Sequence, residues 1–191
     1  MHSALIAVFF FLALPLGTSG CAYRLGLSER ALPGGYSEIA IPVFDNRSGD
    51  VGIEMYFTNA LIRRFARSQV ARVVDKEDSP LVLEGAIVKV ETIAGPAQTD
   101  QELQTLPEGA VLTTEYRVVV HTSIVLRRRS DEKIIWQGGF SNERVYPAPR
   151  IGESVLNSAN ATYNHSARLY EISRLAEDMM EEAHDRITEN F

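Results

Sequence analysis

The sequence contains a single cysteine, Cys21, and its first twenty residues contain no Asp, Glu, Lys or Arg. One cysteine excludes a disulfide within the chain, and a free thiol would be open to oxidation outside the cytoplasm. No apolar run reaches the length of about 20 residues that a membrane-spanning helix needs. Residues 4–16 are almost purely apolar, and the small residues Gly17, Ser19 and Gly20 follow them. This pattern predicts a signal peptide over residues 1–20.

Sequence motifs of catalysis are also missing. The sequence has no P-loop, no Gly-x-Ser-x-Gly elbow and no dinucleotide-binding glycine motif. His121, His165 and His184 lie far apart and match no metal-binding spacing such as His-Glu-x-x-His. Because catalysis needs convergent groups that this sequence does not indicate, we expect no enzyme activity, no catalytic residues and no metal ligands.

An excess of positive charge is absent as well. The chain has 19 Lys and Arg residues against 25 Asp and Glu residues, a net charge of −6. We therefore expect no nucleic-acid partner, and any anion-binding site must be a local patch. The densest basic run is Arg127-Arg128-Arg129, with Lys133 beyond a predicted turn. Asp131 and Glu132 lie between them, so a solvated turn and an anion site are both open interpretations.

The position of Cys21 indicates that its thiol is not free. Ser19-Gly20-Cys21 resembles the lipobox of bacterial lipoproteins, in which small residues precede a cysteine that is lipidated and becomes the first mature residue. The resemblance implies acyl chains, palmitate among them, on Cys21, and no other cofactor is expected. Ala22, which is not Asp, is compatible with sorting to the outer membrane. A conventional secreted protein, cleaved nearby, is the alternative.

The mature chain alternates strand-type and helix-type patterns. A β-branched strand is expected over residues 37–46, followed by a helix in which Ile53, Phe57, Leu61 and Phe65 form one stripe. Strands are expected over residues 80–93, 113–129 and 134–145, the last two as a hairpin. A final helix begins near residue 160, with the apolar stripe Leu169, Ile172, Ala176, Met179, Ala183 and Ile187.

The order β-α-β-β-β-α predicts an α+β fold with two helices packed on one face of a four-stranded mixed sheet. We expect residues 21–37 to form the lipidated N-terminus and a tether, and residues 38–191 to form a single periplasmic domain. In the strand over residues 113–129, Tyr116, Val118, Val120, Thr122, Ile124 and Leu126 share one face. The connector 94–110 is long for a loop and is therefore expected to be functional or mobile.

Three stretches together carry a resemblance to a known family. They are the mature start "CAYRL", the segment "IAIPVFDNRSGDVGIEMYFTNALIRRF" and the strand "LEGAI". In this order they resemble the lipopolysaccharide-assembly lipoprotein family, LptE. The resemblance implies a lipid-anchored protein on the periplasmic side of the outer membrane. It would plug the LptD β-barrel as its assembly partner and assist lipopolysaccharide transport to the cell surface.

Another lipoprotein function is the alternative. "IAIPVFDNRSG" also resembles the opening of lipoproteins that activate a peptidoglycan synthase or form a secretion pore. The short tether favours a partner within the outer membrane itself. Direct lipopolysaccharide binding would need cations for the lipid A phosphates, and Arg127, Arg128, Arg129 and Lys133 are the candidates. We expect "IPVFDN" to be a strand and turn and Trp136 to be a core or sheet-edge aromatic, not ligand contacts.

Overall fold

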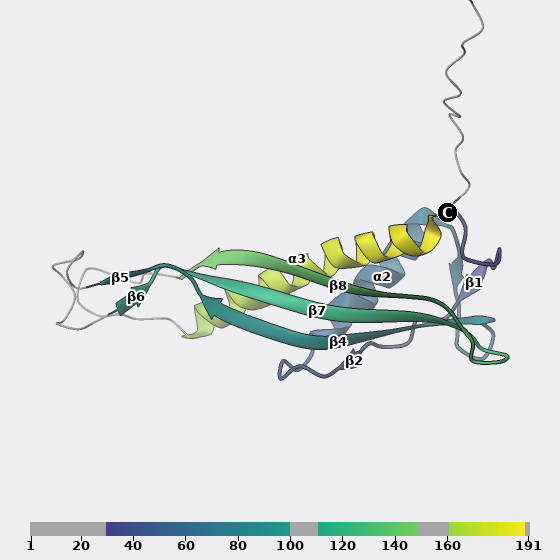
Figure 1. The fold of residues 1–191 in the computed structure, drawn as a ribbon, viewed down its shortest axis with the longest axis horizontal. Helices are drawn as coiled ribbons and strands as arrows, with labels where there is room; N and C mark the ends of the chain where they lie inside the picture. Colours follow the sequence, from purple (N-terminus) through teal and green to yellow (C-terminus); the bar gives the residue numbers. More distant parts are fainter. Residues whose placement is uncertain (1–29, 100–110, 149–160, 190–191) are drawn as a thin grey trace, which may run out of the picture.

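The computed structural model describes residues 30–99, 111–148 and 161–189 (Figure 1). The predicted signal peptide, Cys21 and most of the tether lie outside these residues, as does most of the connector 94–110. The elements are β1 Glu38–Ile39, β2 Asp45–Asn46, α2 Glu54–Ser68, β3 Arg72–Val73, β4 Leu81–Ala94, β5 Ala97–Thr99, β6 Val111–Thr113, β7 Glu115–Arg128, β8 Ile134–Pro147 and α3 Ala161–Thr188.

The main sheet has four strands in the order β2-β4-β7-β8. β2 runs parallel to β4, and the β4–β7 and β7–β8 pairs are antiparallel, so the sheet is mixed. Figure 1 shows α2 and α3 on the same side of this sheet. The predicted α+β class, the two helices and the β7–β8 hairpin are therefore confirmed.

The core lies between this sheet and the two helices. On β7, Val118, Val120, Ile124 and Leu126 are all 0% exposed, as the alternation predicts. The predicted stripes of both helices are buried against them, including Phe57, Phe65, Ile172 and Met179. Each fully buried side chain of this kind contributes roughly 1.5–3 kcal/mol of transfer free energy. Packing of the core begins as early as Leu32, which is 1% exposed.

The first predicted strand is wrong as a continuous element. The chain over residues 37–46 forms two short strands, β1 and β2, with an irregular segment between them. Pro42 has no N–H to donate to a neighbouring strand. The N–H of Phe44 donates to Oγ1 of Thr58 on α2 at 3.0 Å, and not to a strand. β1 instead pairs in parallel with β3, a strand that the sequence did not predict.

The connector 94–110 also departs from the predicted loop. β4 continues to Ala94, and β5 pairs antiparallel with β6 in a second small hairpin. Figure 1 shows this hairpin extending from one end of the molecule, beyond the helices. The function expected of this connector is untested, because residues 100–110 lie outside the described part.

Candidate functional site

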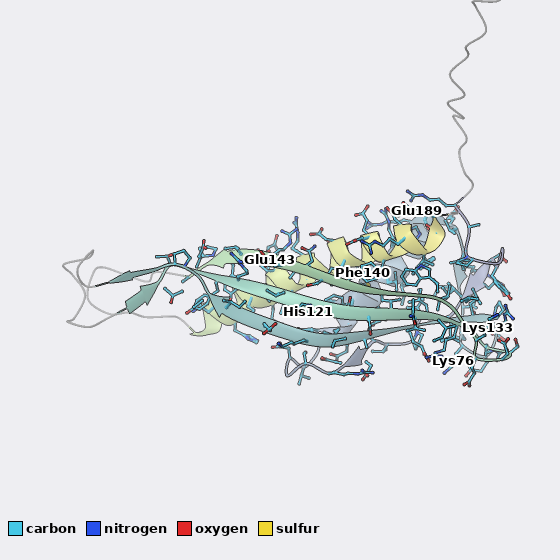
Figure 2. The ribbon with its side chains drawn as sticks, viewed as in Figure 1. Lys76, His121, Lys133, Phe140, Glu143 and Glu189 are labelled. Carbon is cyan, nitrogen blue, oxygen red and sulfur yellow. The ribbon has the colours of Figure 1, made fainter. Side chains whose placement is uncertain are left out.

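The face of the sheet opposite the helices is uncovered within the described residues. The β7 side chains on this face are partly or largely exposed: Arg117, Val119, His121, Ser123, Val125 and Arg127. Strand register places β4 and β8 residues beside them, for example Glu91 and Glu143 on either side of Val119. Figure 2 shows His121 and Glu143 on these strands. We call this surface the open sheet face.

Charges on the open sheet face are paired across and along the strands. Nζ of Lys89 lies 2.8 Å from a carboxylate oxygen of Glu91, and Nε2 of His121 lies 3.7 Å from the other oxygen. Arg117 pairs with Glu143 at 3.6 Å. The hydrogen bond from Lys89 is the largest influence that lowers the pKa of Glu91. The face thus carries donors and acceptors that already satisfy one another.

Apolar side chains lie among these charges. Val88, Ile93 and Val145 are 45%, 49% and 46% exposed, and Ile134 is 42% exposed. Ile93 and Val145 lie in register with Arg117 from the two neighbouring strands. A surface of this mixed character can contact both polar and apolar groups of a protein partner, as interface rims and cores do.

The structure brings the four predicted basic residues to the β7–β8 turn. Nε of Arg127 lies 3.0 Å from Glu84 on β4, and Nη1 of Arg128 lies 3.1 Å from Asp131 within the turn. Among the described residues, no carboxylate pairs with the side chain of Arg129 or Lys133. Figure 2 shows Lys133 at the tip of the molecule. Two of the four cations are therefore partly neutralised, and two are available.

A shallow hollow lies beside this turn. It has a volume of about 470 Å³ and is lined by Tyr36, Pro80, Arg128, Arg129 and Ser130. The N–H of Arg129 donates to the carbonyl oxygen of Pro80, which fixes the turn against the start of β4. We call Arg127, Arg128, Arg129 and Lys133 the basic turn. Its geometry suits an anion that approaches from solvent and does not provide a closed site.

The segment after "IPVFDN" is held by Asn46. Its Nδ2 donates to the carbonyl oxygen of Asp50 at 2.6 Å and to a carboxylate oxygen of Glu54 at 2.7 Å. Its Oδ1 accepts the N–H and the hydroxyl of Ser48 at 3.0 and 2.7 Å. Every polar atom of this side chain is used inside the loop. The predicted turn at the end of this motif is confirmed, whereas the predicted strand is limited to Asp45–Asn46.

Arg168 joins this loop to α3 and to the sheet. Its Nη1 and Nη2 donate to the two carboxylate oxygens of Asp50 at 2.6 and 2.7 Å, and its Nε donates to Oγ1 of Thr92 on β4 at 2.7 Å. The hydrogen bonds from Arg168 lower the pKa of Asp50, against the opposing effect of burial. Sequence reasoning missed this contact, because 118 positions separate the two residues.

His184 forms a hydroxyl–imidazole–carboxylate chain with Ser68 and Asp185. Its Nε2 lies 2.8 Å from Oγ of Ser68, and its Nδ1 lies 2.9 Å from Oδ1 of Asp185. Burial lowers the pKa of His184, which is 0% exposed. Ser68 is the last residue of α2, where the partial negative charge of the helix end opposes an oxyanion. The chain therefore fits a packing contact between α2 and α3 better than acyl transfer.

Trp136 has the structural role that the sequence predicts. Its ring stacks on Phe140, with centroids 6.3 Å apart, and lies directly over Gly138. Within the described residues, no group of three or more His, Cys, Asp or Glu side chains could hold a metal ion. No helix in that same part of the chain is both long and apolar enough to span a membrane.

These features define a two-layer α+β domain whose two distinctive surfaces are an uncovered sheet face and a basic turn. The family model described as LptE, lipopolysaccharide-assembly, matches residues 36–190, and the chain belongs to this family. Its family is therefore one of lipopolysaccharide-assembly proteins. Among curated proteins, none matches the sequence.

Several solved structures are similar to this chain in fold. A PelC dodecamer from Paraburkholderia phytofirmans is 11% identical with a TM-score of 0.46, covering 81% of this chain and 90% of that one. A minor lipoprotein from Acinetobacter baumannii is 11% identical with a TM-score of 0.44, covering 79% and 92%. Lipoprotein GNA1162 from Neisseria meningitidis is 12% identical with a TM-score of 0.41, covering 72% and 99%.

Proposed function

We propose that this chain is an outer-membrane lipoprotein, anchored through acyl chains on Cys21, that plugs an LptD-type β-barrel and assists lipopolysaccharide transport. The observation that carries the proposal is the family match over residues 36–190. The partner is a large outer-membrane barrel, and the protein acts by binding and assembly. The domain lies on the periplasmic side of the membrane.

The open sheet face supports the proposed partner. The interior of an outer-membrane barrel is polar, so a plug must present hydrogen-bonding and charged groups. The face offers Lys89, Glu91, Arg117, His121 and Glu143 in one continuous array over three strands. The exposed valines and isoleucines between them add apolar contact area.

The start of the described chain supports a position close to the membrane. Nη1 of Arg30 lies 3.0 Å from Asp185, and the N–H of Ala31 donates to the carbonyl oxygen of Thr188. Nine positions separate Cys21 from Arg30. Fully extended, they span at most about 30 Å. The domain would therefore remain within reach of a barrel in the same membrane.

The basic turn supports direct contact with lipopolysaccharide. Arginine grips phosphate through parallel charge-assisted hydrogen bonds, and lipid A carries phosphates. In this proposal Arg129 and Lys133 make the first contacts, and Arg127 and Arg128 exchange their carboxylate partners for phosphate. The hollow beside the turn leaves room for the incoming headgroup.

The proposal is tested by purifying the tagged lipoprotein from membranes in detergent and identifying its partner. A stoichiometric barrel protein is expected, and depletion of the lipoprotein should reduce both assembled barrel and surface lipopolysaccharide. Recovery of a peptidoglycan synthase or of a secretion pore, with normal surface lipopolysaccharide after depletion, would favour the alternative.

A further inference from the structure

A groove lies between the outer flank of α2 and the strand β3. It has a volume of about 580 Å³ and is lined by Ile62, Phe65, Ala66, Gln69, Ala71, Arg72 and Val73. Most of these side chains are apolar, and the only charged one, Arg72, pairs outward with Glu38. Ala66 is exposed, and Ile62 and Val73 are half-buried, so none of the described residues covers this surface. An apolar groove of this size favours an apolar occupant.

One wall of the groove is an unpaired strand edge. Among the described residues, β3 pairs only with β1, in parallel. The N–H of Arg72 donates to Ser37 and that of Val74 donates to Ile39, so both residues face β1. Backbone directions alternate along a strand, and the N–H and C=O of Val73 therefore face the other way. The groove thus offers backbone hydrogen bonds as well as apolar contacts, which is the arrangement that binds an extended segment.

The sequence before Arg30 has the pattern that such a groove would bind. Between Cys21 and Arg30, Tyr23, Leu25 and Leu27 alternate with Arg24, Gly26 and Ser28. This is the period of a strand with one apolar face. A simple flexible tether would need no such alternation, since small polar residues suffice.

The chain can reach the groove from where its described part begins. Asp185 contacts both Arg30 and His184, and His184 contacts Ser68, the residue before the groove residue Gln69. Figure 1 shows the end of α3 at the same end of the molecule as β1. The segment has only to pass the end of α2, a helix about 10 Å across. Eight extended residues span about 26 Å.

We infer that residues 22–29 bind in this groove as an added strand on β3, with Leu25 and Leu27 between Val73 and the Ile62–Ala66 flank of α2. The lipidated cysteine then directly precedes the bound strand, which begins at Ala22. The lipid anchor then holds the domain in a defined orientation at the membrane surface, because no flexible linker separates the anchor from the domain. The inference concerns the chain's own N-terminal segment and stands apart from the identity of the barrel partner.

The alternation provides an internal control for the first test. Four double variants of the full, lipidated chain are purified in detergent. Each carries Ala66→Cys and one further substitution: Arg24→Cys, Leu25→Cys, Gly26→Cys or Leu27→Cys. Disulfide formation requires Cβ atoms about 3.5–4.5 Å apart. We expect at least one of the Leu25 and Leu27 pairs to oxidise tenfold faster than the Arg24 and Gly26 pairs, measured by loss of maleimide labelling. Similar rates at all four positions, or no disulfide at any, would overturn the inference.

Hydrogen exchange gives a second readout that needs no cysteine. The amides of residues 23–27 should exchange at least tenfold more slowly than in a free peptide of the same sequence. Ala66→Glu, an exposed position, should abolish this protection while circular dichroism and the thermal midpoint stay unchanged. Arg67→Glu, on another side of α2, should leave the protection intact. Unprotected amides in the wild type, with palmitate binding to the groove instead, would contradict the inference.

Discussion

The ring of Phe44 occupies the space in which a side chain at position 85 would stand. A Cβ atom built on Gly85 would lie 2.2 Å from Cζ and 2.3 Å from Cε2 of Phe44. The two residues come from the two stretches, "PVFDN" and "LEGAI", that carry the family resemblance. The pair therefore explains why these two residue types occur in the two stretches. The glycine on β4 leaves room for the aromatic ring, and the ring closes the edge of the core.

Gly85→Ala should consequently destabilise the protein. Forcing a methyl group against a buried ring costs about 1–3 kcal/mol, which urea unfolding measures directly. Gly139→Ala is the matched control, because its Cβ would meet only the carbonyl oxygen of Thr122, at 3.9 Å. We expect the control to change stability by less than about 0.5 kcal/mol. Partial recovery of stability in the double variant Gly85→Ala with Phe44→Leu would assign the loss to this contact. Equal losses of stability in Gly85→Ala and Gly139→Ala would contradict this explanation.

The elements that the sequence predicts are those with a repeated local pattern. The stripe through Phe57 and Phe65 and the alternation around Val120 and Ile124 each extend over several residues, so burial of one face dictates the element. β3 is a strand of two residues, too short to show a period. The break before β2 depends on the hydroxyl of Thr58, which only the fold brings to Phe44.

The candidate surfaces were predictable to different extents. The basic turn is contiguous in sequence, so Arg127 to Lys133 could be named before the fold was known. The pairing of Arg127 with Glu84 could not be predicted, because 43 positions of chain separate the two residues. The apolar groove at β3 was equally inaccessible, since Ile62 and Val73 each look like ordinary core positions in sequence.

Breaking the contact between Asp50 and Arg168 should cost stability in a pH-dependent manner. Asp50→Ala leaves a mostly buried guanidinium without its partner, a loss of about 1–3 kcal/mol at neutral pH. The pKa of Asp50 is lowered from its usual 3.8 in the folded state, so its contribution is present above pH 3.8 and is lost as pH falls through the folded value. The difference between wild type and variant should therefore shrink below pH 3.8.

A surface pair provides the comparison for this experiment. Asp45 and Arg47 are 2.7 Å apart but about 60% exposed, and Asp45→Ala should cost less than about 0.5 kcal/mol. Urea unfolding of both variants between pH 2.5 and pH 7 gives the two curves. An Asp50→Ala curve that parallels the wild type throughout would show that the carboxylate contributes nothing specific.

His184 should make the protein less stable in mild acid. Burial lowers its pKa below the usual 6.5, so the unfolded chain binds the proton more readily than the folded protein does. Stability is then fully present above pH 6.5 and declines as pH falls toward the folded pKa. His184→Gln should lower stability at pH 7 but flatten the slope between pH 7 and pH 5. An unchanged slope, measured by thermal unfolding across this range, would show that other groups produce it.

The state of Cys21 is directly measurable. We expect the mature protein to begin at Cys21 with three acyl chains and to fractionate with the outer membrane, because one chain alone anchors only weakly. Mass spectrometry of the purified N-terminus reads both the cleavage site and the lipid mass. Cys21→Ser should release the protein from the membrane without unfolding it. An unmodified cysteine, or cleavage elsewhere, would remove the anchor from the proposed function.

The basic turn should determine direct binding to lipopolysaccharide. Replacing Arg127, Arg128 and Arg129 by Gln together with Lys133→Gln removes four charges, and we expect affinity at low salt to fall at least tenfold, about 1.4 kcal/mol. The wild type should bind more weakly as salt rises, and this dependence should be reduced in the variant.

The control removes four other exposed charges, at Arg47, Arg67, Lys76 and Arg174. Lys76 lies at the same end of the molecule as Lys133 in Figure 2, so the control also separates the turn from general charge at that end. Both variants must retain the circular dichroism of the wild type and must co-purify with the same partner protein as the wild type. Equal lipopolysaccharide affinity in the two variants would place any direct site away from the β7–β8 turn.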